Sequence, residues 1–263
     1  MSTITGHTGL TALLGSPVAH SISPLMHNEA FRLLELDYVY LCFDVNEETL
    51  PAAVAGLRTC GIRGFNLTMP NKNKIVELLD ELSPEAQLIG AVNTVLNDNG
   101  KLIGYNTDGY GFMQSVRDAG YDVTNKNITV MGVGGASMAI CAQSALDGAS
   151  SVHIFARRTS RYWNRTQKFA ENLTAKTGCQ VCLFDNDDHT ALKDSIAQSY
   201  LLINATSVGM VPDIDDTIIK DTSLFRPGLV VAAGNPTSQG GQGCRLPNFQ
   251  RNVYASSPGC KSI

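Results

Sequence analysis

The chain has 263 residues, a hydrophobic fraction of 43%, a charged fraction of 17% and a formal net charge of -4. This length allows one large domain or two smaller ones, and the composition excludes a disordered chain because it can bury an apolar core. The net charge argues against a nucleic-acid partner, whose recognition needs a surface of clustered Lys and Arg.

The sequence also argues against a membrane or secreted protein. It contains no apolar run of about 18 residues, the length that a membrane-spanning helix needs. The first residues have neither a basic start nor an apolar stretch, so we predict no signal peptide. Seven scattered cysteines are typical of reduced thiols, and we expect a cytoplasmic protein. Cys179 and Cys182 have the spacing of a redox or metal pair, but their apolar neighbours favour a strand, so no metal site is predicted.

The first 106 residues alternate short apolar runs with helical stretches. We expect strands at residues 11–15, 38–44, 64–68, 92–96 and 102–105, and helices at residues 24–36, 50–58 and 73–82. Pro24 opens the first helix. The apolar face of that helix is expected to consist of Leu25, Met26, Ala30, Phe31, Leu33 and Leu34.

From residue 108 the alternation becomes regular. We expect helices at residues 108–119, 135–147 and 162–177, and strands at residues 128–131, 152–156, 181–184, 201–204 and 229–232. Such βα units form parallel sheets that are covered by helices. The sequence therefore predicts an α/β protein with a first α/β domain at residues 1–106, a second domain at residues 107–232 and an irregular tail at residues 233–263.

A glycine-rich turn opens the second series. Gly132, Gly134 and Gly135 lie between an expected strand and an expected helix, which is the context that a Rossmann-type nucleotide-binding turn requires. The first glycine permits a tight turn, the second lets the backbone approach a pyrophosphate, and the helix N-terminus offers free N–H groups. Ser137 stands where a third glycine is frequent. The alternative is a plain turn between a strand and a helix.

The end of the next strand bears on the choice of cofactor. An NAD site usually has an Asp or Glu there, which binds the ribose 2′-hydroxyl. This chain instead has Arg157-Arg158-Thr159, followed by Arg161. Arginine can donate two hydrogen bonds at once to a 2′-phosphate, so the segment favours NADP, although NAD stays possible. The alternative is a solvated basic loop.

Five further segments make the chain resemble the shikimate dehydrogenases, including the quinate/shikimate dehydrogenases, over about residues 8–232. The segments are residues 20–24 (His-Ser-Ile-Ser-Pro), 66–72 (Asn-Leu-Thr-Met-Pro-Asn-Lys), 90–94 (Gly-Ala-Val-Asn-Thr), 104–109 (Gly-Tyr-Asn-Thr-Asp-Gly) and 204–210 (Asn-Ala-Thr-Ser-Val-Gly-Met). The family reaction is the reversible reduction of 3-dehydroshikimate to shikimate by a nicotinamide cofactor, a step in the biosynthesis of aromatic amino acids.

The resemblance implies a role for each matching residue. Lys72 and Asp108 are implied as the catalytic pair, and the first domain as the substrate-binding domain. The implied substrate-binding residues are Ser21, Ser23, Asn66, Thr68, Lys72, Asn93 and Asp108. The cofactor-binding residues expected from the two motifs and the resemblance are Gly132, Gly134, Gly135, Ala136, Arg157, Arg158, Thr159, Thr206, Ser207 and Met210. The expected partner is a small molecule, and the expected state is a monomer or a homodimer.

Elementary chemistry agrees with these roles. Hydride transfer to a ketone creates an alkoxide, which needs a proton donor within about 3 Å. A lysine can donate this proton, and a neighbouring carboxylate can orient its ammonium group. Taken singly, Lys72 could be a surface lysine and Asp108 a helix N-cap, and Ser21 and Ser23 could be turn residues. Only their joint occurrence favours a site.

Two alternatives stay open at this point. Residues 69–72 (Met-Pro-Asn-Lys) resemble the quinate/shikimate type, whereas Arg158-Thr159 resembles the NADP-specific type, so a quinate/shikimate dehydrogenase using NAD or NADP is possible. A protein of another class, which binds shikimate and cofactor without turnover, would not need Lys72 or Asp108.

The family pattern stops after Ala232. Family members continue with helices that return to the first domain, whereas residues 233–263 have little apolar periodicity. A frame shifted by one base, with permitted codons for residues 250–260, translates into a segment similar to the missing one, so we hypothesise a frameshift. Without those helices we expect apolar surface on the first domain and a product that is poorly stable and weakly active or inactive.

Overall fold

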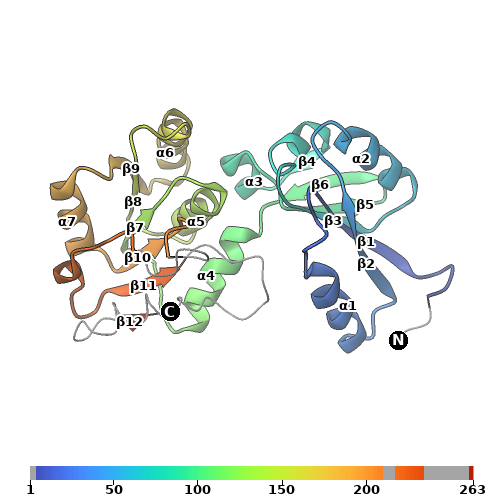
Figure 1. Cartoon of the computed structure of the whole chain (residues 1–263), viewed down its shortest axis with the longest axis horizontal. Coiled ribbons are helices and arrows are strands. Elements are labelled where there is room, and N and C mark those ends of the chain that lie inside the picture. Colours follow the sequence, from blue (N-terminus) through green and yellow to red (C-terminus); the bar gives the residue numbers. More distant parts are fainter. Residues whose placement is uncertain (1–3, 210–216, 234–260, 263) are drawn as a thin grey trace. The chain divides into compact units, whose positions relative to one another are not determined.

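The computed structural model describes residues 4–209, 217–233 and 261–262. The chain is α/β, as the sequence predicts, and it divides between Thr107 and Asp108 into two compact units. Each unit is built on its own six-stranded sheet (Figure 1). The expected tail falls almost entirely outside the described residues, apart from Ala233 and a two-residue strand near its end.

The first unit has a mixed sheet with the strand order β2-β1-β3-β5-β6-β4. Strand β1 is parallel to β2 and β3, whereas β5 is antiparallel to β3 and β6. The elements are β1 (Gly9–Gly15), α1 (Ser23–Leu33), β2 (Tyr38–Asp44), α2 (Leu50–Thr59), β3 (Gly64–Leu67), the 3-10 helix η1 (Lys74–Leu78), β4 (Glu81–Leu82), α3 (Pro84–Ile89), β5 (Thr94–Asp98) and β6 (Lys101–Tyr105). Asn99 and Gly100, both with positive φ, make the turn between β5 and β6.

The expected helix at residues 73–82 is wrong. Helix η1 is short, and the chain then extends because the Asp80 carboxylate accepts from the Leu102 N–H and the Asp80 N–H donates to the Leu102 carbonyl. Strand β4 follows and pairs with β6. Helix α3, which the sequence analysis missed, begins where the Ser83 hydroxyl accepts from the Ala86 N–H, ahead of a proline in the first turn.

The expected apolar face of α1 is largely uncovered. No residue of this helix is buried, and Leu25, Leu33 and Leu34 are 77%, 66% and 67% exposed. Phe31 is half-buried against a small cluster that includes Tyr40. The spacing of apolar residues predicted the helix correctly, but it could not show which neighbour would cover it.

The second unit has a wholly parallel sheet with the order β12-β11-β10-β7-β8-β9. Its elements are α4 (Asp108–Asp118), β7 (Asn127–Met131), α5 (Gly135–Leu146), β8 (Ser151–Ala156), α6 (Trp163–Thr177), β9 (Gln180–Asp185), α7 (His189–Gln198), β10 (Leu201–Asn204), the 3-10 helix η2 (Thr222–Leu224), β11 (Val230–Ala233) and β12 (Lys261–Ser262). Helices α5 and α7 lie on opposite sides of this sheet (Figure 1). The order reverses between β7 and β10, where doubly wound sheets bind their ligands.

Three elements of this unit were missed from the sequence: α7, the 3-10 helix η2 and β12. Helix α7 begins where the Asp188 carboxylate accepts from the Ala191 N–H at 2.9 Å. Strand β12 pairs with β11 from within the segment that was expected to be irregular. Among the residues that the structure describes, every helix is too short or too polar to cross a membrane.

Candidate active site

Asn66 and Asn93 meet where β3 and β5 pair. Asn66 lies in β3 opposite Thr94, the first residue of β5, and Asn93 directly precedes that strand. The Asn66 amide nitrogen donates to the Asn93 carbonyl at 3.2 Å and to the Thr94 hydroxyl at 3.0 Å. The Thr94 hydroxyl donates in turn to Asn93 Oδ1 at 3.0 Å. The antiparallel register therefore links two of the expected substrate-binding residues.

Tyr40 and Thr107 extend this network at its two ends. The Tyr40 hydroxyl donates to Asn66 Oδ1 at 2.9 Å, and burial raises the pKa of Tyr40, so the phenol stays protonated. At the other end, the Thr107 N–H donates to Asn93 Oδ1 at 2.9 Å. The sequence analysis missed Tyr40, Thr94 and Thr107 as site residues, although a tyrosine hydroxyl in an otherwise apolar strand is a signal of a polar partner.

Ser21 and Ser23 lie in the turn that leads into α1, and both are half-buried. The Ser21 hydroxyl accepts from the Ser23 N–H at 3.2 Å. This is the turn role that the sequence analysis gave as the alternative for Ser21. Ser21 also forms a side-chain hydrogen bond with Cys42 in β2. Burial raises the pKa of the Cys42 thiol, and this hydrogen bond lowers it in part. Cys42 stands two residues after Tyr40, on the same face of the strand.

Thr68 directly follows β3 at the carboxyl end of the parallel strands. Its N–H donates to the Leu14 carbonyl at 3.0 Å. A Cβ on Gly15 would stand 2.2 Å from the Thr68 methyl carbon, so glycine is needed for this close approach. The ends of β1 and β3 are therefore held together beside the Asn66 network.

Lys72 and Asp108 belong to different units. Lys72 is half-buried in the turn before η1, and its carbonyl accepts from the Val92 N–H at 2.8 Å, next to Asn93. Asp108 is the first residue of α4 and is also half-buried. It directly follows Thr107, whose N–H and hydroxyl bind Asn93. The chain thus places the Lys72 backbone and the residue before Asp108 around the same asparagine.

The glycine turn of the second unit has the geometry of a nucleotide site. Gly132 has a φ of +108°, and a Cβ there would stand 2.9 Å from the Thr206 methyl carbon. At Gly134 and Gly135 a Cβ would meet nothing within 4 Å. Ser137, at the position of the usual third glycine, is buried and donates to the Gly132 carbonyl at 2.6 Å, which fixes the turn.

The start of α5 fits a phosphate group. Its N-cap, Gly134, makes no side-chain hydrogen bond, and its first turn contains no acidic residue. A helix start with a partial positive charge and no capping side chain is the arrangement that binds a pyrophosphate. Ala136 lies in this first turn and is half-buried.

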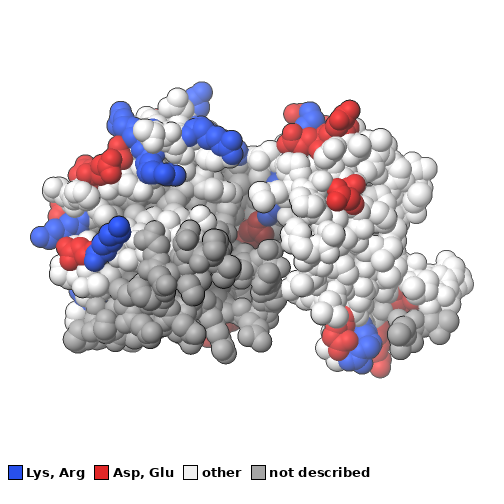
Figure 2. Space-filling view, viewed as in Figure 1, with Lys and Arg blue, Asp and Glu red and all other residues white. Residues whose placement is uncertain are grey.

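Arg157, Arg158 and Thr159 follow β8 and are exposed. The Arg158 guanidinium lies 5.4 Å from the centre of the Trp163 ring, a stacking that holds it beside the start of α6. Figure 2 shows that Lys and Arg side chains gather over the α6 region of this unit. A basic segment with no acid at the strand end fits a 2′-phosphate better than a free 2′-hydroxyl.

The loop after β10 completes the arrangement. The Thr206 hydroxyl donates to Asn204 Oδ1 at 2.7 Å and accepts from the Val208 N–H at 3.1 Å. The contact with Gly132 brings this loop to the glycine turn, at the reversal of strand order. Ser207 is exposed beside Thr206, and Met210 lies outside the described residues.

Of the two CxxC cysteines, Cys179 directly precedes β9 and Cys182 lies within it. Burial raises the pKa of Cys179 to about 11. A thiol with so high a pKa is protonated at neutral pH and is a poor nucleophile. Cys179 therefore behaves as a packed side chain.

Comparison with known proteins decides the family. The model of the shikimate dehydrogenase substrate binding domain matches residues 13–95. The shikimate dehydrogenase (NADP(+)) of Listeria innocua is 48% identical over 229 residues, 87% of this chain and 78% of the relative. That of Streptococcus pyogenes serotype M49 is 50% identical over 230 residues with the same coverage. The chain belongs to the shikimate dehydrogenase family.

A solved member of the family has the same fold. The shikimate 5-dehydrogenase of Listeria monocytogenes, solved in complex with shikimate and NAD, is 42% identical, with a TM-score of 0.91. The match covers 100% of this chain and 88% of that protein. The segment matched by the family model contains the expected substrate-binding residues of the first unit, from Ser21 to Asn93.

Proposed function

We propose that the chain catalyses the reversible, NADP-dependent reduction of 3-dehydroshikimate to shikimate. The observation that carries the proposal is the identity of 48–50% with relatives named shikimate dehydrogenase (NADP(+)). The hydrogen-bonded set around Asn66 and Asn93 supports it, because a ring with several hydroxyls needs convergent small polar groups. In this proposal residues 1–106 bind the substrate and residues 107–232 bind the cofactor.

The hydrogen-bond donors and acceptors of the first unit support the substrate-binding role. Asn66 has both amide protons occupied by Asn93 and Thr94, so it offers a substrate hydroxyl the remaining lone pair of its oxygen. The hydroxyls of Ser21, Ser23 and Thr68 can donate to a carboxylate or accept from a ring hydroxyl. We assign Ser21 and Ser23 to the substrate carboxylate, and the Asn66 network to the ring hydroxyls.

Lys72 and Asp108 carry the proton chemistry of the proposal. The ammonium group of Lys72 donates a proton to the alkoxide that forms when the ketone is reduced, and its amine takes that proton back in the reverse direction. Asp108 orients this ammonium group and accepts from a ring hydroxyl. The nicotinamide cofactor, when bound, supplies or accepts the hydride.

NADP is the proposed cofactor, held by the glycine turn, the start of α5 and the Arg157 to Thr159 segment. NAD is the second candidate, because the Listeria monocytogenes relative was solved with NAD. The loop at Thr206 and Ser207 is proposed to line the nicotinamide side, together with Met210. The cytoplasmic location and the monomeric or homodimeric state stay predictions.

The test is the absorbance of reduced nicotinamide when the purified chain is mixed with shikimate or quinate and with NADP or NAD. We expect weak turnover, because residues 233–263 depart from the family pattern, and the highest kcat/KM with shikimate and NADP. A preference for quinate would replace the substrate. Calorimetric binding of shikimate without any turnover would support a non-catalytic protein instead.

A further inference from the structure

Helix α4, which begins at Asp108, lies directly against α5. In its first turn Gly109 approaches so closely that a Cβ would stand 2.2 Å from the Ala139 carbonyl oxygen. One turn later the Ser144 hydroxyl donates to the sulfur of Met113 at 3.4 Å. Phe112, Met113 and Val116 of α4 are also buried. Apolar contacts have no preferred direction and the sulfur hydrogen bond is weak, so they hold α4 in place with little directional preference.

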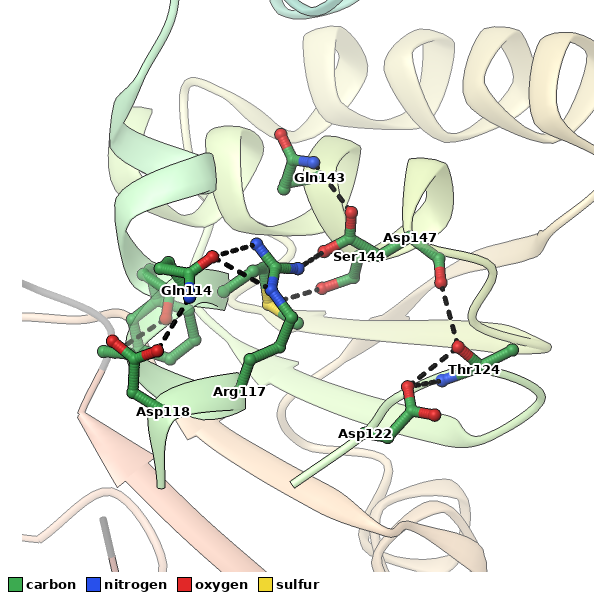
Figure 3. A network of polar contacts seen from close by, with 11 residues as sticks. Gln114, Arg117, Asp118, Asp122, Thr124, Gln143, Ser144 and Asp147 are labelled. Atoms are coloured by element: carbon green, nitrogen blue, oxygen red, sulfur yellow. Dashed lines mark hydrogen bonds and ion pairs between the residues drawn. The ribbon is translucent and has the colours of Figure 1, made fainter. Parts of the chain in front are cut away.

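The directional contact is at the far end of the two helices. Arg117 Nη1 lies 2.7 Å from Asp147 Oδ2, and the Gln143 amide donates to the other carboxylate oxygen at 2.9 Å (Figure 3). Two further nitrogens of Arg117 donate to Gln114 Oε1 at 3.2 and 3.1 Å. Asp147 is 19% exposed and Arg117 is 37% exposed, so solvent and salt screen this ion pair in part.

The residue numbers of the paired contacts rise together along both helices, from Gly109 and Ala139 to Arg117 and Asp147. Helices α4 and α5 therefore run parallel. The first turn of α4 therefore lies at the end of α5 that follows the glycine turn. Ala139, which faces Gly109, is four residues after Gly135. At 1.5 Å per residue this is about 6 Å along the axis of α5. Asp108 thus shares one end of the second unit with the start of α5.

We propose that Arg117 and Asp147 are positioning residues. Their ion pair, which we call the clamp, fixes the rotation and axial position of α4 on α5. This rests on the proposed function, in which Asp108 is catalytic and the start of α5 holds the cofactor. Asp108 is carried on the clamped helix, so the pair sets its carboxylate relative to the bound cofactor. A displacement of about 1 Å in a catalytic group can cost about a hundredfold in rate.

The experiment compares Arg117→Gln with Arg117→Lys and the wild-type chain. We expect Arg117→Gln to lower kcat at least about tenfold, while the Kd for NADP stays within about twofold, because α5 and the glycine turn are untouched. Arg117→Lys keeps the charge and should restore most of kcat. Arg32→Gln is the matched control, since it breaks an exposed ion pair with Glu29 in the first unit. It should change neither value.

The outcomes separate the two proposals. A wild-type chain without turnover would overturn the proposed function and the role of the clamp in it. A wild-type chain that turns over, beside an Arg117→Gln variant with the same kcat and only a lower Tm, would overturn the clamp alone. If Arg117→Gln does not fold, Asp147→Asn, which keeps the shape of the side chain, is measured in its place and judged by the same criterion.

Discussion

In the first unit the expected site residues are hydrogen-bonded to one another, whereas in the second unit the glycine turn borders open space. Asn66, Asn93 and Thr94 are linked side chain to side chain. Gly134 and Gly135 have no side chain, and a Cβ there would meet nothing within 4 Å. Removing a side chain should therefore damage the first site, and adding one should damage the second. The following predictions test this contrast.

The largest effect is expected from Lys72→Ala in the first unit. Loss of the proton donor should lower kcat by about 10²- to 10⁴-fold, because the alkoxide is then protonated only by water. The Kd for NADP should stay near the wild-type value, since the glycine turn lies in the other unit. Stopped-flow absorbance and fluorescence titration measure the two quantities. Lys74→Ala is the control, because Lys74 pairs with the exposed Glu77. Strong residual turnover in Lys72→Ala would contradict the assigned role.

Gly132→Ala should have the next largest effect, and on stability. The new Cβ would stand 2.9 Å from the Thr206 methyl carbon at a φ of +108°. We expect the free energy of unfolding to fall by about 1–3 kcal/mol, measured by urea denaturation.

Gly134→Ala is the matched control for this change. A Cβ at Gly134 meets no protein atom within 4 Å and its φ is -78°, so stability should stay within about 0.5 kcal/mol of wild type. The Kd for NADP should rise instead, because the methyl group fills the space that a pyrophosphate would use. Equal destabilisation by both variants would argue against the division of roles between the two glycines.

A smaller effect is expected from Arg157→Ala. Loss of one charge-assisted hydrogen bond to a 2′-phosphate should raise the KM for NADP about tenfold and leave the KM for NAD unchanged. Steady-state kinetics with both cofactors measures the ratio. Arg165→Ala, an exposed arginine within α6, is the control. A proportional rise in both KM values would show that Arg157 does not distinguish the cofactors.

Much of this contrast could be predicted from the sequence, for physical reasons that differ between the units. The glycine turn is local, so Gly132 and Gly134 could be placed from their strand and helix context alone. The network around Asn66 is not local. Tyr40 and Thr94 reach Asn66 only because of sheet order and register, which no short motif encodes. Pairing with β6 likewise turned the expected helix after residue 78 into a strand.

The smallest effect tests the contrast between α1 and α5. Nine of the twelve residues of α5 are buried, whereas none of α1 is, although α1 was expected to have an apolar face. Leu33 is 66% exposed, so Leu33→Ser should change the free energy of unfolding by no more than about 0.5 kcal/mol. Ile140→Ala, at 1% exposure in α5, should cost about 2–5 kcal/mol and shows that the assay resolves core losses. Both are measured at two protein concentrations. A large, concentration-dependent loss in Leu33→Ser would mean that a second copy covers α1 in solution, because only an association makes stability depend on concentration.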